Sequence, residues 1–254
     1  MSILEVDVLS KNFGGILALL DVSFEVEPGS IFGVIGPNGA GKTTLFNCIS
    51  GLESPTQGRI RFKGADLGGM PPHRIVRKGI ARTFQTARLF VHLSVLQNVM
   101  VARQVHSRST ILHDLVRSPG ARREERACRE HALKYLEMVG LPDLADKRAD
   151  QLTLSQARHL EFARALATEP DLLLLDEPCA GMDEREREAL HNLLTGIQRL
   201  GVTLMVIEHD IEFVVNLCTD LLVLNFGSPI AQGRPEEIQH DEKVLAAYLG
   251  DELV

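Results

Sequence analysis

Alternating and continuous runs of apolar residues mark out the strands of this chain. Residues 3–8 and 22–26 alternate apolar with polar positions and predict two half-buried strands. Residues 172–175 are four leucines in a row, and residues 202–207 form a second, almost unbroken apolar run. Such runs are typical of strands that are buried on both faces. Residues 184–200 lie between these two runs and have the pattern of a polar-faced helix, which predicts a strand–helix–strand unit.

The middle of the chain has a different pattern. Between residues 89 and 154 the apolar positions recur at helical spacing, most clearly over residues 94–102 and 120–139. The second of these segments carries charges of both signs, which indicates a solvated helix face. We therefore predict a helical insertion in this region. Towards the end of the chain, residues 221–232 predict a hairpin and residues 236–249 a closing helix.

A glycine-rich stretch over residues 36–44 fits the phosphate-binding pattern G-x-x-x-x-G-K-[ST]. An apolar strand, residues 30–35, precedes it, and a helical run, residues 45–50, follows it, which is the context that this pattern requires. Glycines let successive backbone N–H groups turn towards an anion, and the next helix adds the positive end of its dipole. The predicted phosphate-binding residues are Gly36, Pro37, Asn38, Gly39, Ala40, Gly41, Lys42, Thr43 and Thr44.

Two further features assign chemistry to this loop. Lys42 is expected to contact the β- and γ-phosphates of a nucleotide, and the Thr43 hydroxyl to bind Mg²⁺. The run of four leucines at residues 172–175 is followed by Asp176 and Glu177. In P-loop proteins an acid at the end of a buried strand holds the Mg²⁺ ion, which predicts that role for Asp176. An acid directly after it can polarise the attacking water, so Glu177 is the predicted general base.

The composition limits the classes of function. The 254 residues allow one large domain or two small ones, and 44% apolar residues suffice for a substantial core. The formal net charge of −7 argues against general binding to nucleic acid or anionic lipid. No apolar segment approaches the ~20 residues that span a bilayer, so membrane association is expected to go through a partner protein. The four widely spaced cysteines indicate reduced thiols of a cytosolic protein.

With these motifs in place, the chain resembles the ATP-binding-cassette (ABC) ATPases over nearly its whole length. Gln85, in Ile80-Ala-Arg-Thr-Phe-Gln85, matches the Q-loop glutamine, which the resemblance implies to sense Mg²⁺ and the attacking water. His209 matches the switch histidine beside the γ-phosphate, and Asp183 matches the D-loop. Phe13 resembles the aromatic residue that stacks on adenine, and core packing is an equally good interpretation of it.

Residues 152–156, Leu-Thr-Leu-Ser-Gln, stand where the resemblance places the signature Leu-Ser-Gly-Gly-Gln. It implies that Thr153, Ser155 and Gln156 contact ATP held by a second cassette. Ser155 stands where a glycine is usual. Serine keeps its backbone N–H and can cap a helix, but it adopts positive φ less cheaply than glycine. We therefore hypothesise a functional but weakened signature.

Several segments resemble one branch of the family, the ATP-binding subunits of branched-chain amino acid importers. The most specific is Ala81-Arg-Thr-Phe-Gln85, which is followed by Arg88-Leu-Phe90. The implied fold is an α/β P-loop NTPase core with an antiparallel β subdomain and a helical subdomain. Within a single domain, residues 1–88 and 155–254 are expected to form the nucleotide-binding core with the β subdomain, and residues 89–154 the helical subdomain.

The implied function is hydrolysis of ATP, with Mg²⁺, to power an importer of branched-chain or other amino acids from the cytoplasmic face of the membrane. The implied partners are transmembrane permease subunits, a second cassette and, indirectly, a solute-binding protein, with no nucleic acid. Two alternatives stay open. A soluble ABC-type ATPase acting on nucleic acid or ribosomes usually carries two cassettes or a long coiled coil, and neither is visible here. A weakly hydrolysing regulatory subunit is suggested only by Leu154 and Ser155.

Overall fold

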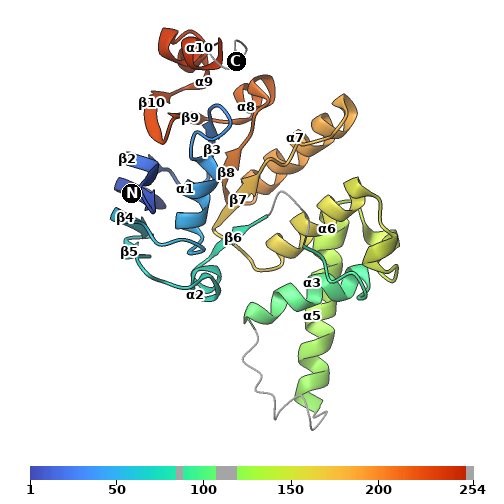
Figure 1. Ribbon diagram of the computed structural model, residues 1–254. Helices are drawn as coiled ribbons and strands as arrows, with labels where there is room; N and C mark the ends of the chain where they lie inside the picture. Colours follow the sequence, from blue (N-terminus) through green and yellow to red (C-terminus); the bar gives the residue numbers. More distant parts are fainter. Residues whose placement is uncertain (84–87, 107–118, 250–254) are drawn as a thin grey trace. The chain divides into compact units, whose positions relative to one another are not determined.

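The computed structural model describes residues 1–83, 88–106 and 119–249 (Figure 1). The chain forms two compact units, the first from Met1–Gln85 with Asp171–Val254 and the second from Thr86–Pro170. The strands of the first unit are β1 (Leu4–Phe13), β2 (Ile16–Val26), β3 (Ile31–Ile35), β4 (Gln57–Phe62), β5 (Ala65–Asp66), β6 (Ile80–Arg82), β7 (Leu172–Asp176), β8 (Thr203–Ile207), β9 (Asp220–Asn225) and β10 (Ser228–Gly233). Its helices are α1 (Lys42–Ile49), α2 (Pro72–Arg77), α7 (Glu184–Arg199), α8 (Ile211–Leu217), α9 (Pro235–Ile238) and α10 (Glu242–Leu249). The helices described in the second unit are α3 (Val95–Arg103), α5 (Pro119–Met138) and α6 (Leu154–Leu166), with short 3₁₀ turns at Gln104–His106, Pro142–Leu144 and Ala149–Gln151.

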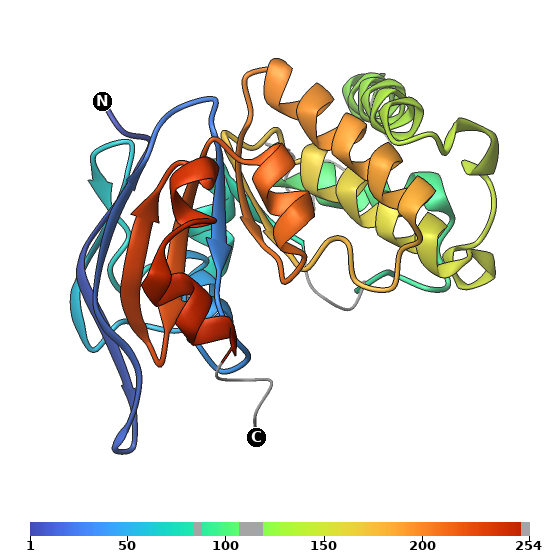
Figure 2. The ribbon, with the colours of Figure 1, turned by 90° about the horizontal axis from the view of Figure 1, so that it is seen from above.

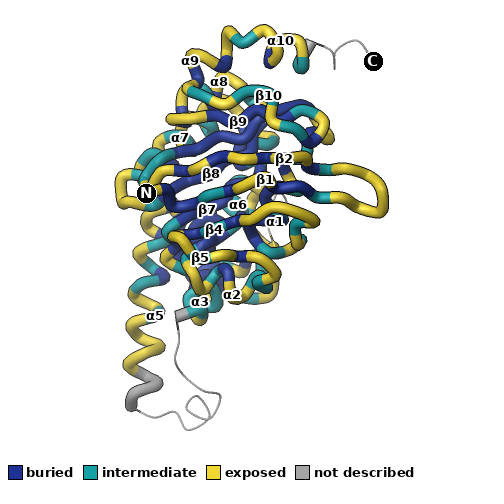
Figure 3. The backbone as a smooth tube through the Cα atoms, turned by 90° about the vertical axis from the view of Figure 1, so that its left-hand side faces the viewer, coloured by how far each residue is buried: buried dark blue, intermediate teal, exposed yellow. Residues whose placement is uncertain are grey.

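A six-stranded sheet forms the centre of the first unit, in the order β10-β9-β3-β8-β7-β6. All of its neighbouring strands are parallel except β10, which pairs antiparallel with β9. Strands β7 and β8 are buried at every position (Figure 3), as their continuous apolar runs predict. Because parallel strands end at the same edge of a sheet, the residues that follow β3, β7 and β8 come together there.

A four-stranded antiparallel sheet, in the order β2-β1-β4-β5, completes the first unit. Its strand β2 contacts β10 of the larger sheet and also α1, and Figure 2 shows the N-terminal strands beside the C-terminal hairpin. Apolar side chains from both sheets and from α1 share one buried cluster. Within it, Phe24 of β2 stacks on Phe32 of β3 with ring centroids 5.2 Å apart. This shared core holds the start of α1 against both sheets.

The second unit is helical. Helices α3, α5 and α6 pack against one another through fully buried residues that include Val99, Leu136 and Leu160. Residues 123–127 of α5, which carry charges of both signs, are exposed (Figure 3). A helix that contributes few apolar positions to a core leaves such a face in water. The predicted helical insertion is therefore confirmed.

The end of the chain departs from the prediction of one closing helix over residues 236–249. It forms the two helices α9 and α10. The Asp241 carboxylate accepts hydrogen bonds from the backbone N–H groups of Lys243 and Val244, at 2.7 and 3.3 Å. An acidic side chain that caps backbone donors in this way starts a new helix. The predicted hairpin before it is present as β9 and β10, with Gly227 in the turn at a φ of 81°.

Candidate nucleotide-binding and hydrolytic site

The glycine-rich loop between β3 and α1 has the backbone that phosphate binding requires. Gly36 and Gly41 have φ values of 145° and 102°. A Cβ at Gly36 would lie 2.0 Å from the Leu224 carbonyl oxygen, and one at Gly41 would lie 2.6 Å from the Ala18 carbonyl oxygen, so both positions need glycine. Helix α1 starts at Lys42 with no side-chain cap and no acidic residue in its first turn. Its first backbone N–H groups are therefore available to an anion.

The Lys42 side chain folds back onto this loop. Its Nζ donates hydrogen bonds to the carbonyl oxygens of Gly36 and Pro37, at 2.6 and 2.9 Å, and the residue is only 6% exposed. Burial lowers the pKa of the Lys42 ammonium, and the nearby carboxylates of Glu177 and Asp176 oppose that shift. A buried ammonium that is bonded only to neutral carbonyl groups gains from a negatively charged partner. The phosphates of a nucleotide provide such a partner.

Two oxygen-bearing side chains fit the predicted Mg²⁺ site. Thr43 lies exposed in the first turn of α1, and the buried Asp176 side chain ends β7 with 7% exposure. No group of three or more His, Cys, Asp or Glu side chains among the described residues could hold a metal ion. Mg²⁺ binds through one or two protein oxygens together with water and substrate phosphates. These residues therefore suit a Mg²⁺ ion that also contacts phosphate.

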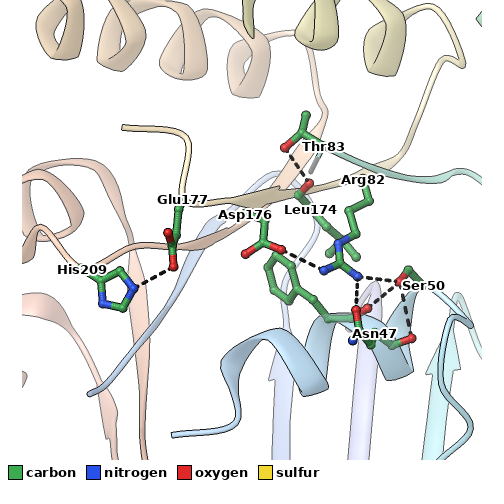
Figure 4. A network of polar contacts seen from close by, with 9 residues as sticks. Asn47, Ser50, Arg82, Thr83, Leu174, Asp176, Glu177 and His209 are labelled. Atoms are coloured by element: carbon green, nitrogen blue, oxygen red, sulfur yellow. Dashed lines mark hydrogen bonds and ion pairs between the residues drawn. The ribbon is translucent and has the colours of Figure 1, made fainter. Parts of the chain in front are cut away.

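The predicted base and the switch histidine are in direct contact. His209 Nε2 lies 2.7 Å from Glu177 Oε1 (Figure 4). Because an ionised carboxylate only accepts hydrogen bonds, Nε2 is the protonated ring nitrogen in this contact. The Glu177 N–H donates to the Ile207 carbonyl oxygen at 2.9 Å, so the ends of β7 and β8 hold the pair together. Glu177 also has a φ of 49°, an uncommon conformation that often occurs at functional sites.

A buried carboxylate that the sequence interpretation did not assign supports this pair. Glu208 is 3% exposed. Its Oε1 accepts the Cys179 N–H at 2.5 Å, and its Oε2 accepts the His209 N–H at 3.1 Å. On the other side of His209, Asp210 accepts the Phe213 N–H at 3.0 Å and a bond from Arg187 at 2.7 Å. Glu208 therefore holds the backbone N–H of His209, and Asp210 caps the helix that follows it.

We expect Glu208→Gln to change how stability depends on pH. Burial raises the pKa of Glu208 above its ordinary value of 4.5, although its backbone hydrogen bonds oppose that shift. Between 4.5 and the raised pKa the folded state binds more protons than the unfolded state. The contribution of Glu208 to the free energy of unfolding is therefore lost as the pH rises through this window. Glutamine does not titrate, so this contribution is absent from the variant.

Urea unfolding at a series of pH values from about 4 to about 8 measures the effect. The difference in unfolding free energy between wild type and Glu208→Gln is expected to vary with pH in this range. Glu212→Gln, at an exposed position on α8, is the matched control and should run parallel to the wild type. If Glu208→Gln also runs parallel, the group does not titrate with a raised pKa in the folded protein.

The signature residues belong to the second unit, at the start of α6. Thr153 is the N-cap of this helix: its hydroxyl accepts the Gln156 N–H at 3.2 Å, and the Gln156 side chain accepts the Thr153 N–H at 3.1 Å. Ser155 lies in the first turn of α6 and is not among the residues with positive φ. The conformational penalty that we expected for serine at this position is therefore absent. Leu154 is 68% exposed.

The other predicted residues are Phe13, Asp183 and Gln85. Phe13 ends β1 with 42% exposure, and Lys11 Nζ lies 4.6 Å from its ring centroid, so the ring is not a core residue. Asp183 is the N-cap of α7 and accepts the Glu186 N–H at 2.9 Å. Gln85 lies outside the described residues. The remaining predicted residues, in the loop and at the ends of β7 and β8, are brought together in the first unit.

A second residue that the sequence interpretation did not assign is Arg82, at the end of β6. Its guanidinium contacts Asp176 at 2.8 Å, and also Asn47 of α1 and Ser50 directly after that helix (Figure 4). The available signal was an arginine inside the short apolar run that precedes Gln85. Its partner is 94 residues away in the sequence, so only the folded chain reveals the contact.

Comparison with known proteins shows the family of this chain. A sequence profile described as "ABC transporter" matches residues 19–180, and one described as "Branched-chain amino acid ATP-binding cassette transporter" matches residues 228–254. The chain is 42% identical over 250 residues to the "High-affinity branched-chain amino acid transport ATP-binding protein BraF" of Pseudomonas aeruginosa, and the match covers 98% of each chain. None of the described helices is long and apolar enough to cross a membrane.

Solved structures are similar over almost the whole chain. One is a nucleotide-free ATP-binding cassette from an ABC transporter, with a TM-score of 0.85, 32% identity and coverage of 98% of this chain and 99% of that one. Another is a dimeric bacterial ABC transporter cassette, with a TM-score of 0.78, 25% identity and coverage of 91% and 98%. The resemblance inferred from the motifs is thereby confirmed: the chain belongs to the ABC transporter family of ATPases, in the branch of the branched-chain amino acid transport ATP-binding proteins.

Proposed function

We propose that this chain hydrolyses ATP to power the import of branched-chain amino acids or similar amino acids. The observation that carries the proposal is the contact of 2.7 Å between His209 and Glu177, directly after Asp176 at the end of β7. A chain that only binds nucleotide has no need of a positioned base. The branch to which the chain belongs supports the choice of solute, because its relative in Pseudomonas aeruginosa is named for branched-chain amino acid transport.

The proposed mechanism depends mainly on positioning and charge, as phosphoryl transfer requires. The loop N–H groups and Lys42 hold the phosphates of the substrate ATP. Thr43 and Asp176 would hold Mg²⁺, which neutralises phosphate charge when it is bound. Glu177 accepts a proton from the attacking water. His209 holds the Glu177 carboxylate in place through its hydrogen bond.

The proposed partners follow from residues outside this set. Thr153, Ser155 and Gln156 stand at a helix N-terminus, which attracts anions, and we assign them to ATP held by a second cassette. The likeness to a dimeric cassette supports such a pair of cassettes. In the proposed pair, Asp183 of this chain belongs to the D-loop, and Phe13 stacks on the adenine of ATP. The Gln85 loop and the helical insertion transmit closure of the pair to transmembrane permease subunits. The chain then acts on the cytoplasmic face of the membrane, and a solute-binding protein delivers the amino acid.

Reconstitution tests this proposal. The chain is purified with its permeases and paired cassette, placed in proteoliposomes, and supplied with MgATP and solute-binding protein. Phosphate release is expected to rise several-fold with leucine, isoleucine or valine and to stay at its basal rate with glutamate or urea. Stimulation by the other solutes alone would overturn the choice of solute. Failure of the isolated, folded chain to bind adenine nucleotide in calorimetry would overturn the ATPase itself.

A further inference from the structure

We propose that Arg82 serves as a built-in counter-ion of Asp176, which keeps Mg²⁺ from binding before ATP. The proposal rests on the nucleotide site described above. Arg82 Nη2 donates to Asp176 Oδ2 at 2.8 Å, and the two side chains are only 6% and 7% exposed. Figure 4 shows the guanidinium between Asp176 and helix α1. A cation therefore already sits against the carboxylate that is predicted to face the metal.

The guanidinium is held from a second side, so it does not depend on Asp176 for its place. Its Nη1 donates to Asn47 Oδ1 of α1 at 2.8 Å and, at 3.0 Å, to the Oγ of Ser50, the residue that caps the C-terminus of this helix. The Phe46 ring, on the same helix, lies 5.6 Å from the guanidinium carbon. The planar fork of arginine suits such a fixed arrangement better than lysine does. Arg82 is thus a positioning residue that bridges α1 and the end of β7.

Only one oxygen of Asp176 is used in this contact. Within the described part of the chain, the other oxygen, Oδ1, has no hydrogen-bond partner. Arg82 therefore holds the orientation of the carboxylate and leaves one oxygen for a metal or its water. An oxygen shared with a guanidinium attracts a cation less strongly than a free carboxylate does.

The charges around the site explain why the cation is expected to bind together with ATP and not before it. Lys42 and Arg82 carry two positive charges, and Asp176 and Glu177 carry two negative charges. The formal charges of these four side chains cancel, and the described residues provide no cage of carboxylates for a divalent cation that approaches alone. The phosphates of ATP change that balance, so the cation is expected to bind with the nucleotide. A buried ion pair contributes little net stability, so stability alone does not account for this one.

The test measures cation binding without nucleotide and without turnover. Mn²⁺, which shares the oxygen preference of Mg²⁺, is titrated into the full chain, and the free ion is followed by electron paramagnetic resonance. Arg82→Met is expected to bind Mn²⁺ at least about tenfold more tightly than the wild type. The double variant Arg82→Met, Asp176→Asn should lose this gain. Arg61→Met, which removes an arginine with 39% side-chain exposure from β4, is the matched control and should bind like the wild type.

Each outcome decides the proposal. Equal Mn²⁺ affinity of Arg82→Met and the wild type would overturn it, as would a gain that persists in the double variant. Urea unfolding checks that each variant is folded, and Arg82→Gln serves as a second neutral variant. For the wild type alone, ATP is expected to raise Mn²⁺ affinity at least about a hundredfold; equal affinity with and without ATP would also overturn the proposal. A wild type that binds no ATP at all would instead refute the proposed function.

Discussion

Replacing Glu177 by glutamine is expected to abolish multi-turnover ATP hydrolysis and to leave ATP binding nearly unchanged. Glutamine has the shape of glutamate but cannot accept a proton from the attacking water, and loss of a positioned general base costs about 10²- to 10⁴-fold in rate. The amide oxygen can still accept the His209 hydrogen bond that Glu177 Oε1 now makes at 2.7 Å. The loop at residues 36–44 is untouched, so its hold on the phosphates remains.

Phosphate release in the assembled transporter measures the rate, and a fluorescent ATP analogue measures binding to the same preparation. Glu188→Gln, at an exposed position on α7, carries the same chemical change away from the site and should keep wild-type turnover. Sustained hydrolysis by Glu177→Gln would show that another group takes the proton. Loss of nucleotide binding together with hydrolysis would show that Glu177 supports the fold of the loop instead.

Replacing Lys42 by methionine is expected to weaken ATP binding at least about a hundredfold. Charge-assisted hydrogen bonds are about twice as strong as neutral ones, and this one also neutralises phosphate charge. A hundredfold change corresponds to about 2.7 kcal/mol. The Nζ that now bonds to Gly36 and Pro37 lies at the loop itself, so methionine at this position removes a positive charge from the loop.

Without nucleotide, Lys42→Met is expected to be at least as stable as the wild type. Burial lowers the pKa of Lys42 below its ordinary value of 10.5, so the folded state binds fewer protons than the unfolded state between the lowered pKa and 10.5, and below this window the cost of burying the charge is fully present. The charged side chain therefore costs stability at neutral pH. Lys42→Met removes this cost, so its thermal midpoint without nucleotide should equal or exceed that of the wild type.

Thermal unfolding with and without MgATP measures both effects at once. The wild type should be stabilised by the ligand and Lys42→Met should not, because a ligand stabilises only in proportion to its affinity for the folded state. Lys134→Met, at an exposed position on α5, should respond to MgATP like the wild type. Equal stabilisation of Lys42→Met would contradict the assignment of Lys42 to the phosphates.

The local sequence was sufficient to predict structure and chemistry where all the determining residues lie in one short segment. The loop at residues 36–44 lies between a strand and a helix, and its glycines and lysine stand at fixed spacing within nine positions. The buried strands β7 and β8 were equally clear, because a strand with both faces covered must be apolar throughout. The α/β fold class followed from these segments, and the family followed from them together with the motifs at Gln85, residues 152–156, Asp183 and His209. Both are confirmed. The boundary between α9 and α10 was missed, because the capping role of Asp241 depends on local backbone geometry.

Only the tertiary structure joined residues that are distant in sequence. Arg82 meets Asp176 across 94 positions, and Glu208 meets the backbone of Cys179 across 29. In the sequence, Arg82 is an isolated arginine and Glu208 is an acid beside a histidine. No sequence pattern around either residue predicts its partner. Their roles come from burial: a charged group taken out of water must find an opposite charge or backbone donors. Which partner it finds is decided by the order of strands in the sheet, and no local pattern in this chain encodes that order.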